Sequence, residues 1–518
     1  MSPSQHKVAR VDDLPTGHGT RVCIKHDASE TPILLVRDGQ AVHAFSPDCP
    51  HAGAPLEEGA ICNGRIVCPW HKGTFEISDG SLVEPPALKG LTRYPVTVSN
   101  GDVFVSLGAE APKTQDEHGA DKTMLIVGAG AAGAAACAAL REGGFSGRIV
   151  LAGDDARKPY DRTSLSKFVL SGDMPPDDVP PLLDDDFFDA HKIERELTRA
   201  VRLDASNKQA EFASGRTVDY DAALVCTGGT PKPLKAPGSN LKHIHLLRNR
   251  EHAKEILASL DAVQSPVRVV IVGASFIGLE VASCLRKRKI EVTVVAPGKV
   301  PFAKQFGTRI GEMFKRMHEQ NGVTFHMDTH VSAFEGDDAV REVLLESGER
   351  LQANVVIAGT GVTPATDFIT GVTMGDDEGM EVDASMLAAP SLYAAGDIAR
   401  FPLPRAGAMG RIEHWRVAQQ HARVAAYNMA GIAREYIGVP FFWTFHYDKN
   451  FEYLGHVSEP EHVEIDGDLD QQQFIAYLLK DGEVRAVVGC GHEAAIGRLA
   501  EAMREPITLD AARRVVSS

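Results

Sequence analysis

The sequence is poor in positive charge and has no long apolar run. Lysine and arginine number 54, against 70 aspartate and glutamate residues, and the formal net charge is −16. This balance argues against nucleic acid as a partner, because phosphate binding needs a surface rich in lysine and arginine. It also disfavours binding to anionic membranes. No apolar run approaches the roughly 20 residues that span a bilayer, so we expect no membrane span.

Targeting signals and paired cysteines are missing as well. Residues 1–15 are polar, carry Asp12 and Asp13, and contain no apolar core of a signal peptide. Eight cysteines are scattered through 518 residues, which is typical of a reducing compartment. We therefore predict a cytoplasmic protein. No Cys-x-x-Cys or Cys-x₄-Cys pair is present, which excludes a redox-active disulfide of these types.

The residue composition and the apolar pattern change three times along the chain. Short β-like runs broken by Gly, Pro and Asp predict a small all-β domain over 7–107. Residues 108–121 have almost no large apolar side chain and predict a flexible linker. Apolar strands then alternate with Ala/Leu-rich helices, and a strand–glycine turn–helix pattern occurs twice, which predicts two Rossmann-like α/β nucleotide-binding domains. We assign 122–240 with 360–436 to the first, 241–359 to the second, and 437–518 to a carboxyl-terminal α+β domain.

Two loops carry one cysteine and one histidine each. Cys49-Pro-His51 is followed, after sixteen intervening residues, by Cys68-Pro-Trp-His71. A Rieske [2Fe–2S] cluster needs two thiolates on one iron and two imidazoles on the other. A Cys₂His₂ zinc site is the alternative, but zinc fingers usually pair Cys with Cys before His with His. The order therefore favours a cluster bound by Cys49, His51, Cys68 and His71.

This region resembles Rieske domains over about a hundred residues, including the stretch from His71 to Phe75. Respiratory-type Rieske proteins carry an additional disulfide between the two loops. Here Ala54 and Trp70 stand at the corresponding positions, so the resemblance is to low-potential Rieske ferredoxins. We expect the nearby Cys62 to be a buried thiol.

The first glycine turn is complete. A short apolar strand runs into Gly128, Gly130 and Gly133 and then into an alanine-rich helix. Such glycines allow a tight turn and a close approach of backbone to a pyrophosphate at the helix N-terminus. Asp154 lies 21 residues after Gly133, at the end of the next predicted strand, and should bind a ribose hydroxyl.

The second glycine turn departs from the pattern. It consists of Gly273, Ser275 and Gly278, so that a serine replaces the middle glycine. The next predicted strand ends at Ala296 without a carboxylate for a ribose, and Lys299 and Lys304 follow. This leaves the choice between NADH and NADPH open.

From Lys122 onward, several motifs in order resemble FAD-dependent pyridine-nucleotide oxidoreductases of the ferredoxin-reductase and apoptosis-inducing-factor group. They are Pro159–Arg162, Leu165–Lys167, Cys226–Gly229, Tyr393–Asp397 and Glu413–Trp415. Thr163 and Ser164 stand where prolines are usual. Together with the preceding Rieske-like region, the chain is most similar to the apoptosis-inducing-factor-like Rieske oxidoreductases.

This resemblance implies which residues contact the cofactors. The first nucleotide-binding domain would bind FAD and the second NADH or NADPH. Lys167 would lie near the flavin N5 and pair with Glu280, the two acting as catalytic residues. The other implied cofactor-binding positions are Arg162, Val201, Thr227, Gly228, Arg248, Gly361, Asp397, Glu413, His414, Trp415 and Trp443.

The implied function is electron transfer. NAD(P)H gives a hydride to FAD, and the Rieske cluster takes the electrons one at a time and passes them to an unidentified acceptor, either a redox protein or a small molecule. A different class is a redox-sensing or signalling protein with slow turnover. The sequence leaves open whether the chain forms a homo-oligomer.

Overall fold

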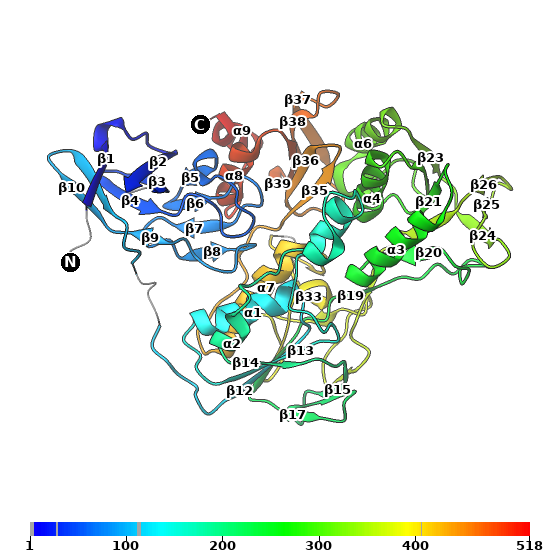
Figure 1. Cartoon of the computed structure of the whole chain (residues 1–518), viewed down its shortest axis with the longest axis horizontal. Coiled ribbons are helices and arrows are strands. Elements are labelled where there is room, and N and C mark those ends of the chain that lie inside the picture. The colour runs from blue at the N-terminus through cyan, green and yellow to red at the C-terminus, as the bar shows by residue number, and fades with distance from the viewer. Residues whose placement is uncertain (1–4, 27–28, 111–114, 406, 518) are drawn as a thin grey trace.

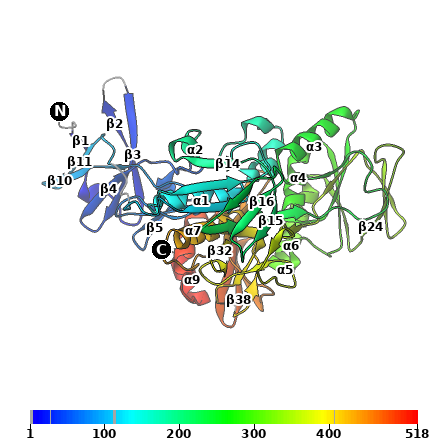
Figure 2. The same cartoon turned by 90° about the horizontal axis from the view of Figure 1, so that it is seen from below.

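The computed structural model describes residues 5–26, 29–110, 115–405 and 407–517. Both views place the amino-terminal β domain at one end of the long axis and the second nucleotide-binding domain, with α3 (Arg250–Ala262) and β24 (Val331–Glu335), at the other (Figures 1 and 2). Within the described part of the chain, no helix is long and apolar enough to cross a membrane.

The amino-terminal domain consists of small antiparallel sheets, as its alternating apolar runs predict. One sheet has the order β2-β3-β4-β9 and a second has the order β5-β6-β7-β8. A third, β1-β11-β10, brings the two ends of the domain together. The bounds are β1 Gln5–Arg10, β2 Gly19–His26, β3 Ser29–Asp38, β4 Ala41–Phe45, β5 Ala60–Cys62, β6 Arg65–Val67, β7 Thr74–Glu76, β8 Leu82–Glu84, β9 Arg93–Tyr94, β10 Val96–Ser99 and β11 Asp102–Ser106.

The first nucleotide-binding domain is built on a six-stranded sheet of order β14-β13-β12-β18-β32-β31. All of its pairs are parallel except β31–β32. Its strands are β12 Thr123–Val127, β13 Arg148–Ala152, β14 Ile193–Glu196, β18 Ala222–Val225, β31 Leu387–Ala389 and β32 Leu392–Ala394. A smaller sheet, β17-β16-β15-β29, adjoins it, with β15 Ala200–Asp204, β16 Gln209–Phe212, β17 Thr217–Asp219 and β29 Ile369–Thr370.

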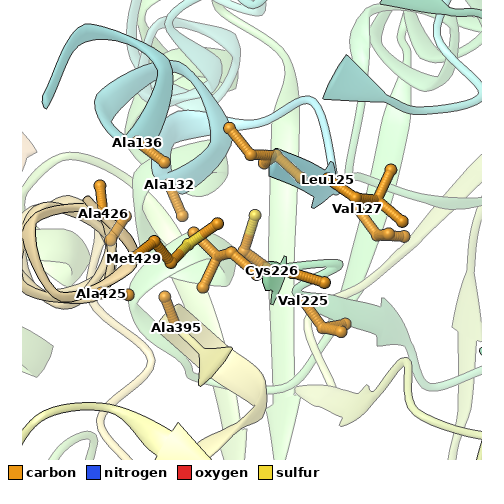
Figure 3. Packing of buried hydrophobic residues seen from close by; sticks show 14 of the residues in the cluster. Leu125, Val127, Ala132, Ala136, Val225, Cys226, Ala395, Ala425, Ala426 and Met429 are labelled. Carbon is orange, nitrogen blue, oxygen red and sulfur yellow. The ribbon is translucent and has the colours of Figure 1, made fainter. Parts of the chain in front are cut away.

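Two helices of this domain pack closely because their shared face is made of small residues. These are α1 (Ala131–Glu142) and α7 (Trp415–Met429), which lie almost three hundred residues apart in sequence. Figure 3 shows their alanines and Met429 projecting into one core with the ends of β12 and β18. The interdigitated packing holds the amino-terminal ends of both helices beside the sheet.

The second nucleotide-binding domain repeats the parallel arrangement with the order β20-β27-β21-β22-β23. The strands are β20 Ile244–Leu246, β21 Arg268–Val272, β22 Glu291–Ala296, β23 Val323–Met327 and β27 Val355–Ala358. The helices α4 (Phe276–Lys287) and α6 (Thr308–Gln320) contribute to its core, and a small antiparallel sheet, β24-β25-β26, completes it, with β25 Glu342–Leu345 and β26 Arg350–Gln352.

The carboxyl-terminal domain is an antiparallel sheet of order β35-β36-β39-β38-β37 with helices α8 and α9. Its apolar segments at 441–445, 474–479 and 484–488 form parts of β35, β38 and β39, and residues 492–504 contain α8. The bounds are β35 Phe441–His446, β36 Lys449–Gly455, β37 His462–Asp468, β38 Gln473–Lys480, β39 Glu483–Cys490, α8 Glu493–Ala502 and α9 Leu509–Ser517.

The amino-terminal domain is docked on the rest of the molecule, which differs from the expected flexible tether. A Cβ atom on Gly497 of α8 would lie 3.3 Å from Ala60 and 3.4 Å from Val67, so this helix lies directly on β5 and β6. In the predicted linker, His118 is bonded through Nε2 to the Ala430 carbonyl at 2.7 Å. Residues 111–114 lie outside the described part, but 115–121 are anchored to the first nucleotide-binding domain.

Buried charges hold this docked arrangement. Glu84, at the end of β8, accepts hydrogen bonds from Gln420 of α7 at 2.7 Å and from Arg504, just after α8, at 2.8 Å. Arg504 also pairs with Glu501, and Arg65 of β6 pairs with the same carboxylate at 2.6 Å. Although burial raises the pKa of Glu84, the Arg416 and Arg504 guanidinium groups lower it below its usual value. Three domains therefore share one network of compensated charges.

Candidate redox site

The two Cys/His loops close on themselves and on each other. The Cys49 N–H donates to the Ala54 carbonyl at 2.9 Å, and the Cys68 N–H donates to the Gly73 carbonyl at 2.8 Å. Each loop therefore folds as a tight turn that carries its cysteine and histidine on one side. The His51 and His71 Nδ1 atoms come within 3.1 Å of each other.

The two cysteine thiols are hydrogen-bonded to each other, which raises the pKa of one and lowers that of the other. The hydrogen bond to Cys68 and then burial raise the pKa of Cys49 well above its usual value. For Cys68, burial raises the pKa, but the contact with Cys49 and the backbone N–H groups of His71 and Trp70 outweigh burial and lower it to about 7. Burial lowers the pKa of His71, so its imidazole is neutral. Thiolates and neutral imidazoles are the forms that bind metal.

This donor set fits a two-iron cluster better than a single ion. Among the described residues, no group of three or more His, Cys, Asp or Glu side chains is arranged around one metal position. Each iron of a Rieske cluster takes only two protein ligands, two sulfurs on one and two nitrogens on the other. A sulfur pair beside a nitrogen pair is what the two loops provide.

The two positions that correspond to the additional disulfide by resemblance have different surroundings. Ala54 is buried and Trp70 is 41% exposed. All eight cysteines are free. The expectation of a buried Cys62 is wrong: its side chain is partly exposed on β5, and burial raises the pKa of its thiol only to about 11.

Next to the second loop lies a buried ion pair that the sequence did not reveal. Lys72 is fully buried and donates to Glu452 of β36 and to the Pro69 carbonyl. Burial raises the pKa of Glu452 to about 8 in spite of the Lys72 charge. The pair ties the loop that carries Cys68 and His71 to the carboxyl-terminal sheet. In the sequence, the only sign of this ion pair is that Lys72 directly follows the predicted ligand His71.

Trp443 connects the Cys/His loops to the predicted flavin side of the molecule. It stands on β35 and is 9% exposed. Its ring centroid lies 4.0 Å from that of His71 and 6.4 Å from that of His51. A residue predicted beside FAD and a residue predicted to bind iron are therefore in van der Waals contact.

The first glycine turn has room for a ligand only at its middle residue. A Cβ on Gly128, where φ is 125°, would lie 2.3 Å from the Cys226 carbonyl, and one on Gly133 would lie 2.0 Å from the Gly128 carbonyl. Gly130 caps α1 with no side-chain bond, and nothing lies within 4 Å of its Cβ position. A helix end without a side-chain cap, beside open space at Gly130, suits an anionic ligand.

Asp154 is exposed just after β13, where a ribose-binding acid is expected. The neighbouring Asp155 accepts the Arg157 N–H at 3.1 Å and so forms a local turn.

Two neighbouring arginines add positive charge that carboxylates compensate only in part. Arg162 and Arg248 are close enough that Arg248, after burial, depresses the pKa of Arg162. Arg248 contacts Asp397 at 3.5 Å. Within the described residues no ion pair is formed by Arg162, whose guanidinium packs over the Tyr160 ring. Two neighbouring cations with so little compensation fit the pyrophosphate of a dinucleotide.

Orphaned polar atoms mark the predicted flavin side. The His414 Nδ1 and Trp415 Nε1 atoms are buried, and in the described part of the chain neither has a hydrogen-bond partner. Burial lowers the pKa of His414 to about 3. Glu413 is held by Arg411 at 2.9 Å. Buried polar atoms are rarely left unpaired, so these atoms fit a bound group that supplies partners.

The remaining predicted positions behave differently. Gly228 has φ of 69°, and its Cβ would lie 2.6 Å from an Arg248 nitrogen. The Thr227 hydroxyl donates to the Ala365 carbonyl at 2.7 Å and is therefore occupied. Val201 is 46% exposed at a β-bulge of β15, so that only its backbone could serve a buried ligand.

Lys167 and Glu280 form the buried ion pair that the resemblance implies. Lys167 lies on a π-helical turn, Leu165–Val169, and Glu280 lies on α4; their charged atoms are 3.0 Å apart. Glu280 also accepts from the Ser166 hydroxyl at 2.5 Å, the Thr444 hydroxyl at 2.7 Å and the Phe445 N–H at 3.3 Å. This donor shell keeps the carboxylate in place. Sequence reasoning missed Ser166 and Thr444, although Ser166 directly precedes Lys167.

A cavity of about 1230 Å³ opens where three domains meet. The amino-terminal domain contributes His51 and His71 to its walls, the first nucleotide-binding domain contributes Lys167, and the carboxyl-terminal domain contributes Trp443. The cavity therefore borders both the cluster loops and the predicted flavin side.

A second cavity, of about 510 Å³, lies on the second glycine turn. It is lined by Gly273, Ser275 and Gly361, and none of its lining residues is Lys, Arg, Asp or Glu. The Ser275 hydroxyl accepts the Gly278 N–H at 3.1 Å and caps α4. Lys299 and Lys304 are exposed and do not line the cavity. The cavity therefore lies on a dinucleotide-type glycine turn, and His330 is the one titratable histidine in its lining.

Fold and site together define an FAD- and NAD(P)H-dependent oxidoreductase with a Rieske [2Fe–2S] domain. Residues 122–422 match the family "Pyridine nucleotide-disulphide oxidoreductase", and residues 4–95 match the "Rieske [2Fe-2S] domain". The chain belongs to the pyridine nucleotide-disulphide oxidoreductase family.

Relatives agree with this assignment. The chain is 35% identical to "Apoptosis-inducing factor 3" of Mus musculus over 96% of this chain and 83% of that protein. It is 34% identical to the "Biphenyl dioxygenase system ferredoxin--NAD(+) reductase component" of Paraburkholderia xenovorans over 70% of this chain and 88% of that protein. The reductase in a solved covalent putidaredoxin reductase–putidaredoxin complex matches with a TM-score of 0.72 and 26% identity over 77% of this chain and 99% of that one.

Proposed function

We propose that electrons from NAD(P)H pass through FAD to the fused Rieske cluster and from there to an external acceptor. The observation that carries the proposal is the contact between the His71 and Trp443 rings at 4.0 Å. It joins the predicted iron-binding loops to the predicted flavin side inside one chain. Because the two domains are fused, the electron donor and acceptor have a high effective concentration and need no diffusional encounter.

In this proposal the cluster is held by Cys49 and Cys68 on one iron and by His51 and His71 on the other. The cluster would supply one-electron transfer. Three features suit the binding of a cluster. The imidazoles are neutral, the pKa of the Cys68 thiol is lowered, and the buried Lys72–Glu452 pair holds the second loop in place.

FAD would bind along the first glycine turn. Gly128, Gly130 and Gly133 would admit the pyrophosphate, with Arg162 and Arg248 facing its charge and Asp154 accepting from a ribose hydroxyl. The flavin would take two electrons from NAD(P)H and release them singly. Thr227, Gly228, Asp397, Glu413, His414, Trp415, Trp443 and the Val201 backbone would line the remainder.

Lys167 would place its positive charge beside the flavin ring. Glu280, held by Ser166, Thr444 and the Phe445 N–H, would fix the Lys167 ammonium group. Both side chains are at least nine-tenths buried, where a fixed charge acts more strongly than in water. We propose these two as the catalytic residues.

NADH is the coenzyme that the second cavity favours. It would lie on Gly273, Ser275, Gly278 and Gly361. A 2′-phosphate is usually held by an arginine, and none of the residues that line the cavity is Lys or Arg; His330 is the one basic side chain in the lining. The named relatives with ferredoxin–NAD(+) reductase activity support the same choice.

The acceptor would reach the cluster through the cavity of about 1230 Å³, which both His51 and His71 line. In the solved complex, putidaredoxin reductase is joined covalently to putidaredoxin. In this chain the Rieske domain would take the equivalent role of first acceptor.

Anaerobic rapid mixing with NADH tests the route. We expect loss of flavin absorbance first, followed by bleaching of the Rieske absorbance. Trp443→Ala should slow the second phase more than the first, because Trp443 contacts His71 and also lines the predicted flavin side. Trp70→Ala is the matched control, because Trp70 also lies against His71 but at 6.4 Å and 41% exposed. A cluster that stays oxidised while the flavin turns over would overturn the proposed route.

A further inference from the structure

Arg416 occupies a position where three domains meet. It is the second residue of α7, directly after Trp415, and its side chain is 3% exposed. Its guanidinium donates to three main-chain carbonyls: Pro85 at 2.6 Å, Lys72 at 3.0 Å and Val439 at 3.2 Å. A charged donor shared among three carbonyls of separate segments is a costly arrangement to bury, and nothing in the local helix requires it.

Each of these carbonyls belongs to a segment that determines the contact between His71 and Trp443. Lys72 directly follows His71 in the second cluster loop. Val439 lies just before β35, the strand that carries Trp443. Pro85 follows β8, the last strand of the cluster-binding sheet. Arg416 therefore holds the backbone on both sides of the 4.0 Å ring contact.

The charge of Arg416 is compensated locally. The Glu84 carboxylate lies 3.9 Å away and is itself held by Gln420 and Arg504. The ring of Phe441 lies under the guanidinium at 5.7 Å. Three donors in a rigid planar fork reach three carbonyls at once, which a lysine ammonium on a flexible stem cannot reproduce with the same geometry.

We propose that Arg416 is a positioning residue for electron transfer: it fixes the His71 loop against Trp443 and so sets the rate at which the cluster is reduced. It touches neither the predicted cluster ligands nor the predicted flavin-binding groups through its guanidinium bonds. This inference rests on the proposed route and deepens it. Electron transfer depends steeply on separation, so a loosened loop should slow this step alone.

Arg423 provides a matched control on the same helix. It is also buried, at 5% exposure, and it also donates to the amino-terminal domain, at the Leu82 carbonyl 3.4 Å away. Its main partner, however, is Glu142 of α1 at 2.9 Å, and it lies two helical turns from Arg416. Its loss should weaken docking without moving the His71 loop.

The test compares Arg416→Lys, Arg416→Gln and Arg423→Gln in the full-length holoprotein. Under anaerobic mixing with NADH, both Arg416 variants should reduce the flavin at the wild-type rate. They should reduce the cluster at least about ten-fold more slowly, because small displacements of reacting groups lower rates by such factors. Arg423→Gln should leave both phases unchanged. The EPR spectrum of the dithionite-reduced cluster should be unaltered in all variants, because the ligands are intact.

A second readout does not depend on turnover. Hydrogen exchange of the backbone in residues 68–75 should be faster in both Arg416 variants and unchanged in Arg423→Gln. Wild-type cluster reduction in Arg416→Gln, or equal slowing in Arg423→Gln, would overturn the proposal. If Arg416→Gln does not fold, Arg416→Lys decides by the same criteria. Failure of NADH to reduce the wild-type cluster would instead refute the proposed route itself.

Discussion

The two glycine turns of this protein share a backbone and differ in what surrounds it. At Gly128 and Gly273 the φ angles are 125° and 113°, and a Cβ would lie 2.3 Å and 2.4 Å from a carbonyl of the neighbouring segment. At the first turn Gly130 leaves the helix end open, and Arg162 and Arg248 lie nearby. At the second turn Ser275 caps the helix itself, and no Lys, Arg, Asp or Glu lines the cavity.

This difference indicates that the first turn holds a permanently bound cofactor and the second an exchangeable coenzyme. A bound anion would stabilise both Arg162, which forms no ion pair among the described residues, and a helix end that has no side-chain cap; this favours a resident anionic cofactor. A helix that is already capped, beside a cavity lined by no Lys, Arg, Asp or Glu, is stable without a ligand and suits a coenzyme that binds and leaves. The same motif can therefore serve a resident dinucleotide and an exchangeable one.

The largest expected effect comes from filling the glycine positions. Gly128→Ala places a Cβ against the Cys226 carbonyl at a φ that alanine avoids, so we expect the purified protein to lose FAD. Gly273→Ala should keep FAD and lose NADH-dependent flavin reduction. Flavin absorbance and rapid mixing measure the two outcomes. If Gly273→Ala also lost FAD, the two sites would not be independent.

The arginine pair should come next. Arg162→Gln removes a charge-assisted contact to the FAD pyrophosphate, with an expected cost of about 1.5–3 kcal/mol, or roughly ten- to hundred-fold in FAD affinity. Titration of apoprotein with FAD, followed by flavin fluorescence, gives the dissociation constant. Arg157→Gln is the control, since Arg157 lies on the same loop but pairs with Glu251. Equal affinity in Arg162→Gln would place the pyrophosphate elsewhere.

A moderate effect should follow from completing the second site. Ala296→Glu places a carboxylate at the end of β22, where the first site has Asp154 just after β13. We expect the ratio of kcat/KM for NADH over NADPH to rise by about ten-fold, equivalent to 1.4 kcal/mol, through repulsion of the 2′-phosphate. Steady-state kinetics with both coenzymes test this. An unchanged ratio would mean that the ribose does not approach Ala296.

The smallest effect should come from the capping serine. Ser275→Ala removes the hydrogen bond to the Gly278 N–H and should lower the free energy of unfolding by about 1 kcal/mol, whereas Ser275→Gly should cost only a few tenths. FAD content should not change in either variant. Denaturant unfolding of the holoprotein, followed by far-UV circular dichroism, compares them. A loss of FAD in Ser275→Ala would contradict the separation of the two turns.

Local patterns predicted the elements whose partners lie close in sequence. The cysteine and histidine of each cluster loop are two or three residues apart, and each glycine turn is six residues long, so spacing alone indicated their chemistry. The flexible linker was predicted from composition, but composition does not show that His118 meets the Ala430 carbonyl.

The sequence by itself determined the two kinds of redox centre and the two nucleotide turns, because each depends on residues within one short segment. Only the tertiary structure decided how they are connected. The Arg416 bond to the Lys72 carbonyl spans 344 positions and the Lys72–Glu452 pair spans 380. The sequence contains many lysines and arginines, and only the packing of the three domains shows that Arg416 and Lys72 are the ones that join them. The contact of His71 with Trp443 exists because that packing places a β turn of one domain against a strand of another.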